Sequence, residues 1–404
     1  MDLSHGREYE DFRREVREFL SSNWPPDGCS ARTPSKDEMA EFRDLATGRG
    51  YLRRGIPKQY GGSEQPADDV RGSILREEFW KAGAPMDPSG IGPMMLVPTL
   101  LDRGEEWQKE KFVPPTSRGD IVWCQGYSEP GSGSDLASLK TRGELVGDEW
   151  VINGQKTWTS GARNADYMFC LVRTEPDQPK HAGISYLLFD MKQPGVDVRP
   201  LKQMTGATDF DEVFLTDVRT PKDWIVGERG EGWQVSRTTL KHERNSVGAA
   251  ESAAVLFAGL VHLAKSTQRA GRPNIEDPGI RQRLVEVEGY VRAHQYSGYR
   301  QLTKNARGEN PGIIQMMNKL VSTNIGHRAS KLVIDLLGDD GLLDPMSTTP
   351  GGHPASANRT WIMQYMLSVG LAIAAGTANI QRNVIAERGL GLPRDVYADG
   401  SRAK

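Results

Sequence analysis

The chain has 404 residues, more than a single hydrophobic core usually serves, which predicts two or three packed units. Its 51 Lys and Arg residues nearly balance its 53 Asp and Glu residues, so no basic excess favours nucleic acid or an anionic membrane surface. Apolar stretches such as Ala253–Ala264 are too short to cross a bilayer. Composition therefore argues against nucleic-acid-binding and membrane-spanning proteins.

The helical pattern of the first part of the chain is regular. Apolar residues recur at helical spacing in Tyr9–Leu20, and similar patterns fill Lys36–Gly50, Val70–Ala82 and Trp107–Phe112. Pro and Gly residues separate these segments. Residues 1–118 are therefore predicted to form an all-α domain.

From Ile121 the chain changes to short runs rich in β-branched and aromatic residues. The predicted strands are Ile121–Ser128, Glu149–Ile152, Tyr167–Arg173, Ile184–Met191 and Glu212–Thr216. The dipeptide Asn153-Gly154 tolerates the positive φ angles of a two-residue hairpin turn. Residues 119–228 are therefore predicted to form an antiparallel β-barrel or sandwich domain.

A helical period returns after Gly232 and continues to Glu387. The segments with this period are Val261–Lys265, Ile280–Leu302, Ile313–Leu337 and Trp361–Glu387. Residues 229–404 are therefore predicted to form a four-helix bundle. Helices, sheet and bundle together make the expected fold class α+β.

The first residues and the cysteines bear on location and metal binding. The amino terminus carries neither a basic leader nor an apolar signal core, so we expect a cytoplasmic protein. Cys29, Cys124 and Cys170 are widely spaced, with no His pair at metal-ligand spacing nearby. We therefore expect buried, reduced thiols and no metal site.

Two segments of the predicted sheet carry small, hydroxylated and aromatic residues. Tyr127–Asp135 leaves a strand in a turn whose backbone N–H groups could approach a phosphate. Lys156–Gly161 places the aromatic face of Trp158 and several hydroxyls at a strand end, where a flat heterocycle could pack. Taken singly, the first segment fits plain loop punctuation better than a phosphate site. The second fits sheet core and turn capping at least as well as a cofactor contact. The chain also lacks a Gly-x-Gly-x-x-Gly fingerprint, which disfavours a Rossmann mode of nucleotide binding.

The two segments together resemble a known family. Trp123–Asp135 followed by Trp150–Asp166 closely resembles the flavin-binding sheet domain of the acyl-CoA dehydrogenases. Ala375–Asn383, followed by Ala386–Arg388, resembles the carboxy-terminal signature of the same family. The resemblance covers essentially the whole chain. It implies a helical domain, a β domain and a four-helix bundle, with FAD bound between the last two and across a subunit interface.

The resemblance also implies which residues contact FAD. They are Tyr127, Ser128, Gly133, Ser134, Trp158, Ser160, Thr377 and Asn379. The first two are expected along the isoalloxazine, and Ser134 near the phosphates. Trp158 and Ser160 are expected on the other face of the ring, and the last two residues approach from the bundle.

The catalytic base does not stand at the position where many members of the family carry it. Family members remove the α-proton with a carboxylate while the β-hydride goes to flavin N5, and in many that carboxylate precedes Gly-Thr. Ala375 stands at this position and cannot accept a proton. A minority branch places its base on a bundle helix within a Glu-Arg pair, which Glu243 and Arg244 supply here.

These residues give a complete expected mechanism. Glu243 is predicted to take the α-proton of an acyl-CoA thioester, with Arg244 limiting the cost of its charge. The backbone N–H of Ala375 is predicted to hold the thioester carbonyl as enolate charge develops. The product would be a trans-2-enoyl-CoA. Without the resemblance, Glu243 would be read as an ordinary solvated helix charge.

The resemblance implies an electron-transfer flavoprotein as electron acceptor and a dimer of dimers as assembly. Two departures favour a mixed assembly. Thr267–Arg272 replaces the family's Arg-x-x-Phe-Gly-type stretch, and Gly338–Gly341 would bring two carboxylates toward the pyrophosphate. A second acyl-CoA dehydrogenase-like subunit would then complete the FAD site, as in heterotetrameric relatives from bacterial steroid side-chain degradation. A small shift in register could instead let Arg269 or Arg272 replace the missing contact.

Two other functions stay open from the sequence. An oxygen-using flavoprotein on the same scaffold fits the absence of a carboxylate at Ala375, and rapid reoxidation of the reduced flavin by air would favour it. A non-catalytic subunit that stabilises an active partner fits the altered flavin contacts. Activity that survives Glu243→Gln in the complex would favour that second alternative.

Overall fold

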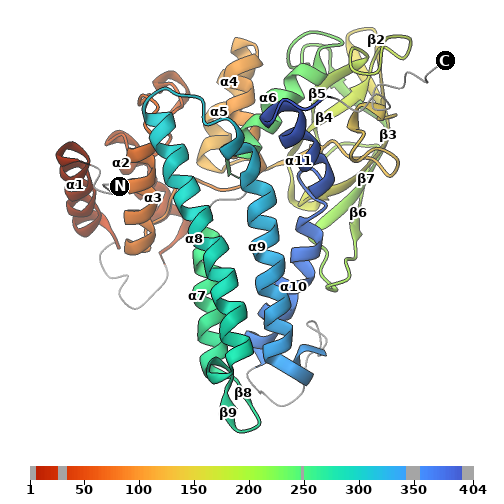
Figure 1. Cartoon of the computed structure of the whole chain (residues 1–404). Helices are drawn as coiled ribbons and strands as arrows, with labels where there is room; N and C mark the ends of the chain where they lie inside the picture. The colour runs from red at the N-terminus through yellow and green to blue at the C-terminus, as the bar shows by residue number, and fades with distance from the viewer. Residues whose placement is uncertain (1–5, 26–33, 247–249, 343–354, 394–404) are drawn as a thin grey trace. The chain divides into compact units, whose positions relative to one another are not determined.

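The chain divides into two compact units. The computed structural model describes residues 6–25, 34–246, 250–342 and 355–393, without the side chains of 243–246, 250–251 and 355–360. One unit combines Met1–Leu201 with Asp209–Glu243, and the other combines Lys202–Thr208 with Arg244–Lys404. Helices, a curled sheet and a second set of long helices follow one another along the chain (Figure 1), which confirms the α+β fold class.

Helices form the first part of the described chain, as predicted. They are α1 (Arg7–Asn23), α2 (Lys36–Gly48), α3 (Asp69–Ala82), α4 (Val97–Arg103) and α5 (Glu106–Arg118), with single turns at η2 (Lys58–Tyr60) and η3 (Gly92–Leu96). A capping box starts α2, because Ser35 and Glu38 each accept a hydrogen bond from the other's backbone N–H, at 3.2 and 2.7 Å. The apolar face of α1 packs against α3.

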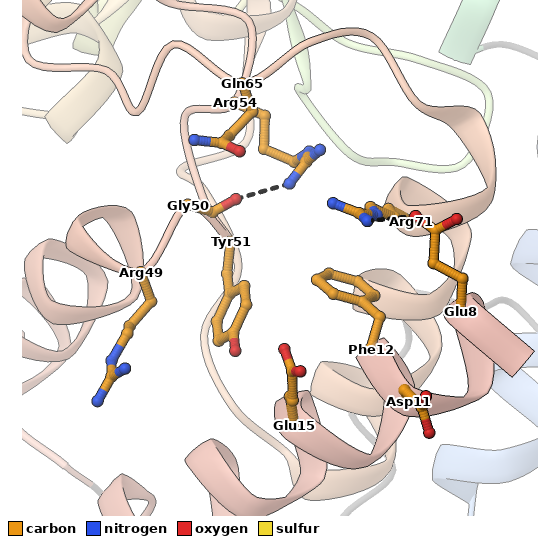
Figure 2. A pocket seen from close by; sticks show the side chains of 10 residues that line it. All are labelled: Glu8, Asp11, Phe12, Glu15, Arg49, Gly50, Tyr51, Arg54, Gln65 and Arg71. Atoms are coloured by element: carbon orange, nitrogen blue, oxygen red, sulfur yellow. Dashed lines mark hydrogen bonds and ion pairs between the residues drawn. The ribbon is translucent and has the colours of Figure 1, made fainter.

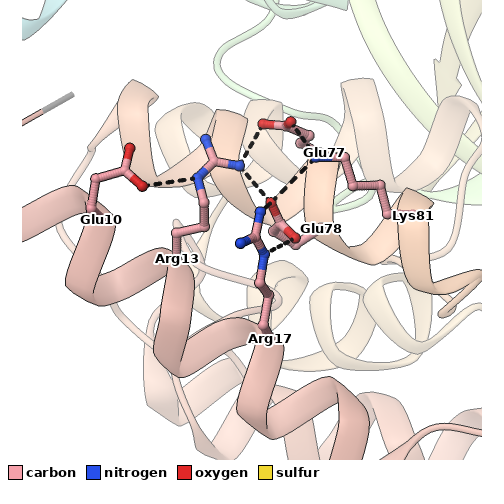
Figure 3. Close-up of polar contacts among 6 residues, drawn as sticks. All are labelled: Glu10, Arg13, Arg17, Glu77, Glu78 and Lys81. Atoms are coloured by element: carbon pink, nitrogen blue, oxygen red, sulfur yellow. Dashed lines mark hydrogen bonds and ion pairs between the residues drawn. The ribbon is translucent and has the colours of Figure 1, made fainter. Parts of the chain in front are cut away.

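An ion-pair cluster joins α1 to α3 (Figure 3). Glu78 of α3 is 3% exposed and accepts hydrogen bonds from Arg13 Nη1 at 2.5 Å and from Arg17 Nε at 2.7 Å. Burial raises the pKa of the Glu78 carboxyl, but the hydrogen bonds from the two arginines outweigh burial and lower that pKa to about 2. The contact between the two helices therefore depends on an ionised carboxylate.

We expect Glu78→Gln to lower the free energy of unfolding by about 2 kcal/mol at neutral pH. The folded-state pKa of about 2 lies below the ordinary 4.5, so the unfolded chain binds the proton first as the pH falls. The stabilisation is complete above the ordinary pKa and disappears as the pH approaches the folded-state value. Urea unfolding of wild type and variant should differ at neutral pH and converge in acid. A difference that does not change with pH would contradict this account.

Seven strands form one mixed sheet. They are β1 (Trp123–Gly126), β2 (Arg142–Val146), β3 (Glu149–Ser160), β4 (Tyr167–Arg173), β5 (Ile184–Asp190), β6 (Val196–Leu201) and β7 (Phe210–Pro221). The order is β1-β4-β2-β3-β7-β6, with β5 paired to β4. Most pairs are antiparallel, as predicted, but β1 and β2 both run parallel to β4. Alternate residues of β4 and β5 enter two separate cores, one of which includes the helices α4 and α5.

The prediction of a hairpin turn at Asn153-Gly154 is wrong. Both residues lie inside β3, and the hairpin turn falls at Gly147, whose φ is 64°, between β2 and β3. Gly154 is needed for a different reason, because a Cβ built there would lie within 2.8 Å of the Cα and Cβ of Thr141. The sheet register also shifts between Ile152 and Gly154, so this glycine marks a bulge.

The remaining elements are mainly helical. They are α6 (Gly232–Ser246), α7 (Ala250–Ser266), β8 (Gln268–Arg269), β9 (Arg272–Pro273), η6 (Asn274–Glu276), α8 (Pro278–Ala306), α9 (Ile313–Leu337), η7 (Gly338–Leu342), α10 (Ala355–Leu371), α11 (Ala378–Val384) and η8 (Ile385–Gly389). Within the second unit α9 packs against α7, α8 and α10, which gives the predicted bundle (Figure 1). The predicted continuous segment Trp361–Glu387 is broken, because Gly376 has a φ of 85° and Thr377 caps a new helix.

None of the helices in the described ranges has the length and apolar character of a membrane-spanning segment. No group of three or more His, Cys, Asp or Glu side chains in the same ranges could hold a metal ion. Cys124 and Cys170 are buried free thiols, whereas Cys29 lies outside the described residues.

Candidate functional site

The loop between β1 and β2 carries the first group of predicted site residues. Strand β1 ends its pairing with β4 at Gly126, and the chain pairs with β4 again at Arg142, the first residue of β2. Glu129 and Ser132 exchange backbone hydrogen bonds of 3.1 and 3.0 Å, which closes a tight turn at the start of the loop. The loop therefore has a defined conformation although it lies outside the strands.

A buried ion pair anchors the loop to β3. Lys156 is fully buried, and its Nζ lies 2.9 Å from Glu129 Oε1. The same ammonium donates to the carbonyl oxygens of Leu171, at 2.8 Å, and Tyr127, at 3.3 Å. Its three donors thus have acceptors, which is the condition under which a charge tolerates burial.

The Glu129 carboxylate accepts two further hydrogen bonds at the far end of the loop. They come from the backbone N–H groups of Lys140, at 2.7 Å, and Thr141, at 2.9 Å. Burial raises the pKa of Glu129, but the charge of Lys156 and these donors outweigh burial and hold the pKa below its ordinary value. An ionised carboxylate therefore ties the end of the loop to its beginning.

A bulge in β3 presents the second predicted segment. The register against β7 shifts between Lys156 and Thr159, so Thr157 and Trp158 together oppose one residue of β7. Trp158 has a φ of 58°, which is a genuine outlier for a bulky side chain, and it is 57% exposed. Phe210 meets the indole edge-on at 5.8 Å. The bulge thus turns a large aromatic side chain outward at the strand end that also carries Ser160, which is exposed.

The same bulge joins the two predicted segments. The Thr157 N–H is released from the β7 ladder and donates to the Ser128 carbonyl oxygen at 2.9 Å. The Tyr127 ring is buried and packs edge-on against Phe169 and Tyr186, at 5.9 and 6.3 Å. The structure therefore brings Tyr127 and Ser128 together with the segment that carries Trp158.

Two features of this first unit fit a flat cofactor that carries phosphates, as FAD does. The exposed indole of Trp158 offers a face or edge for a heterocycle. A Cβ built at Gly131 or Gly133 would meet nothing within 4 Å, so the backbone there is open to an anion. Ser134 is exposed next to it and can donate a hydroxyl. The residues present therefore suit the cofactor.

The predicted residues of the second unit lie where α10 gives way to α11. Thr377 Oγ1 accepts a hydrogen bond from the Ile380 N–H at 3.2 Å and so caps α11. Asn379 is exposed, and its Oδ1 accepts a hydrogen bond from Arg382 at 3.2 Å. Ala375 is exposed and has a φ of 49°, in the left-handed region that alanine rarely occupies.

The predicted base belongs to the last turn of α6. The side chains of Glu243 and Arg244 lie outside the described residues. Four residues earlier, Thr239 is fully buried, with its Oγ1 3.5 Å from Tyr186 Oη. Tyr186 in turn contacts the ring of Tyr127. Residues four apart share one face of a helix, so the backbone of Glu243 lies one turn beyond Thr239 on the face that meets this aromatic pair.

The two departures from the family pattern have defined positions in the second unit. Strands β8 and β9 form a hairpin whose turn residues, Ala270 and Gly271, have φ values of 51° and 76°. The register places Arg269 directly opposite Arg272, and both are exposed. The two aspartates of η7 are also exposed. Each departure thus places charged side chains at the surface of the unit.

A cavity of about 410 Å³ among the N-terminal helices contains none of the predicted site residues (Figure 2). Charged side chains of both signs surround it: Glu8, Asp11, Glu15, Arg49, Arg54 and Arg71. Arg71 pairs with Glu8 at 2.7 Å and lies 5.0 Å from the ring centroid of Phe12. The positive and negative side chains of the lining balance one another, so its charge favours neither an anionic nor a cationic ligand.

Sequence reasoning missed the ion pair of Glu129 and Lys156. A signal was available in the spacing. Lys156 lies an even number of residues from Trp150 and Ile152, so all three share one face of the strand, and Trp150 and Ile152 are buried. A lysine on the buried face of a strand requires a carboxylate partner, and Glu129 stands in the adjoining motif. The bulge at Trp158 had no comparable signal in the sequence.

Three family models match successive parts of the chain. "Acyl-CoA dehydrogenase, N-terminal domain" matches residues 6–120, "Acyl-CoA dehydrogenase, middle domain" matches 124–218, and "Acyl-CoA dehydrogenase, C-terminal domain" matches 230–390. Together they account for most of the described residues, in the order helices, sheet and helices.

Individual proteins give the same result over nearly the whole chain. Acyl-CoA dehydrogenase IpdE1 of Mycobacterium tuberculosis is 36% identical over 400 residues, which cover 96% of this chain and 99% of that protein. Among solved structures, the ChsE4-ChsE5 complex from Mycobacterium tuberculosis matches with 29% identity and a TM-score of 0.75, over 98% of this chain and 100% of that one. The Tcur3481-Tcur3483 steroid ACAD matches with 29% identity and a TM-score of 0.76, with the same coverage.

Proposed function

The chain belongs to the acyl-CoA dehydrogenase family, and on this premise we propose that it oxidises a bulky or long acyl-CoA to the trans-2-enoyl-CoA with Glu243 as the base. The chain is an oxidoreductase of the acyl-CoA dehydrogenase type, and its cofactor is FAD. The identity of the base and of the acyl group is the part that we add.

The proposed chemistry breaks one C–H bond at each of two neighbouring carbons. The Glu243 carboxylate takes the α-proton and becomes a carboxylic acid, while the Ala375 N–H donates to the thioester oxygen. FAD supplies the acceptor for the β-hydrogen, which leaves with its electron pair. The two carbons are left joined by a double bond. The electrons then pass to an electron-transfer flavoprotein.

One observation carries the choice of Glu243. The position before Gly376-Thr377 is an exposed alanine, which has no side chain that can accept a proton. The base must therefore come from another element, and α6 is supported because the face that contains Thr239 runs to the Tyr186 and Tyr127 pair.

We propose eight residues as FAD contacts. In the first unit they are Tyr127, Ser128, Gly133, Ser134, Trp158 and Ser160, and in the second they are Thr377 and Asn379. The exposed indole and the open glycine turn support the first set. We also propose that 1–118, 119–228 and 229–404 act as separate domains.

We propose a mixed assembly and a steroid-type substrate for this chain. The hairpin that holds Arg269 and Arg272, and the exposed aspartates of η7, alter the two stretches through which family members complete a neighbour's FAD site. Two of the structures that the chain matches are named as two-component proteins, and one of them as a steroid ACAD. A related subunit would supply the missing half of the site.

The test is purification with and without a co-expressed second acyl-CoA dehydrogenase-like subunit. Flavin per chain is measured in both preparations, followed by anaerobic bleaching with octanoyl-CoA, palmitoyl-CoA and a steroid propanoyl-CoA thioester. We expect more flavin in the co-expressed complex and the fastest bleaching with the steroid thioester. A full complement of flavin in the lone chain would refute the mixed assembly, and no bleaching by any thioester would refute the dehydrogenase proposal.

A further inference from the structure

Lys319 of α9 is a buried cation in the second unit. It is 8% exposed, and its Nζ lies 2.8 Å from the Leu371 carbonyl oxygen and 2.9 Å from the Gly376 carbonyl oxygen. A lysine is almost never this buried unless its charge is compensated. The contacts of the ammonium group therefore decide why a lysine is tolerated at this position.

The two acceptors of Lys319 bracket the turn that contains Ala375. Leu371 is the last residue of α10, where the final carbonyl groups carry the negative end of the helix dipole. Gly376 follows Ala375 directly. One ammonium group thus fixes both ends of the turn whose four residues, 372–375, connect α10 to Gly376.

A second contact holds the same turn from α11. Gln381 Nε2 donates to the Ala375 carbonyl oxygen at 3.2 Å, and a Cβ built at Gly376 would lie 2.8 Å from that same amide nitrogen. Ala375 itself stays in a left-handed conformation, with a φ of 49°. Such a conformation persists only where the surroundings enforce it. Lys319 and Gln381 provide that constraint.

The constraint matters for the direction of one N–H group. Within the described part of the chain, no acceptor meets the Ala375 N–H. An N–H that is fixed in direction before substrate binds can stabilise developing negative charge without reorganisation. A displacement of about 1 Å at such a group can reduce the rate about 100-fold.

We propose that Lys319 is a positioning residue, which holds the Ala375 N–H in the direction needed to bind the thioester oxygen of the substrate. This inference rests on the proposed function, because that function assigns the N–H its role. Lys319 itself touches neither substrate nor cofactor in this proposal.

The test compares Lys319→Met with Lys319→Arg in the purified complex. Methionine has a similar length but no charge, whereas arginine keeps the cation. We expect amide hydrogen exchange in the segment 371–381 to accelerate in Lys319→Met and to stay close to wild type in Lys319→Arg. With the steroid propanoyl-CoA thioester, kcat should fall about 100-fold in Lys319→Met, with little change in KM.

Lys331→Met is the matched control, because Lys331 is an exposed lysine on the same helix. It should leave both hydrogen exchange and kcat unchanged. Unchanged exchange in Lys319→Met would overturn the proposal, whether or not the enzyme turns over. Faster exchange with an unchanged kcat would overturn it too, because the turn would then be loosened without effect on the reaction. If the wild type does not turn over, the proposed function fails, while the exchange data still decide whether Lys319 holds the turn.

Discussion

Glu243→Gln is expected to lower kcat by about 100-fold to 10,000-fold, because the amide cannot accept the α-proton. Glutamine keeps the size of the side chain, so flavin content and thermal stability should stay near those of the wild type. The measurement is the anaerobic rate of flavin bleaching by the steroid propanoyl-CoA thioester. The bleaching rate of Glu243→Asp should fall between those of the wild type and Glu243→Gln, because aspartate keeps the carboxylate on a shorter side chain.

Glu231→Gln provides the control for this prediction. Glu231 is an exposed residue immediately before α6, so the same chemical change is made near the same helix but outside the proposed machinery. It should bleach at the wild-type rate. A Glu243→Gln complex that turns over as fast as this control would exclude Glu243 as the base and favour a non-catalytic role for the subunit.

The sequence predicted some of the elements that position the site and missed others. Strand β4 begins and ends as predicted, because a strand buried on both faces reads as a continuous apolar run. The loop that starts at Tyr127 was identified from its glycines and serines, and its resemblance to a family supplied the ligand class, which composition alone could not. Its fixed conformation was not predicted, because it depends on contacts with Lys156 of a distant strand.

Two features of the sheet could not be predicted from the sequence, because they depend on contacts between distant segments. Asn153-Gly154 has the composition of a turn, yet close approach of Thr141 explains its glycine, and no local pattern contains that contact. The positive φ of Trp158 contradicts every propensity of a bulky aromatic residue. It exists because β3 and β7 lose register at that point, and such a loss is a property of the pair of strands.

The second large effect concerns the ion pair beneath the loop. Lys156→Met is expected to lower the free energy of unfolding by about 3–5 kcal/mol, because it leaves the Glu129 carboxylate buried without its counter-charge. Both side chains are almost fully buried, at 0% and 7% exposure, so solvent cannot compensate. Urea unfolding monitored by tryptophan fluorescence gives this quantity. Flavin content should fall as well, because the Tyr127 carbonyl oxygen loses its donor.

The double variant Lys156→Met with Glu129→Gln separates burial of a bare charge from loss of hydrogen bonds. Removing both charges should restore part of the stability lost in Lys156→Met, while the flavin content stays low, because the link from β3 to the loop is still missing. Lys222→Met is the control, since Lys222 forms an exposed ion pair with Asp148 on the same sheet, and such pairs contribute little. If the double variant bound flavin as well as the wild type does, the ion pair would stabilise the sheet without positioning the loop.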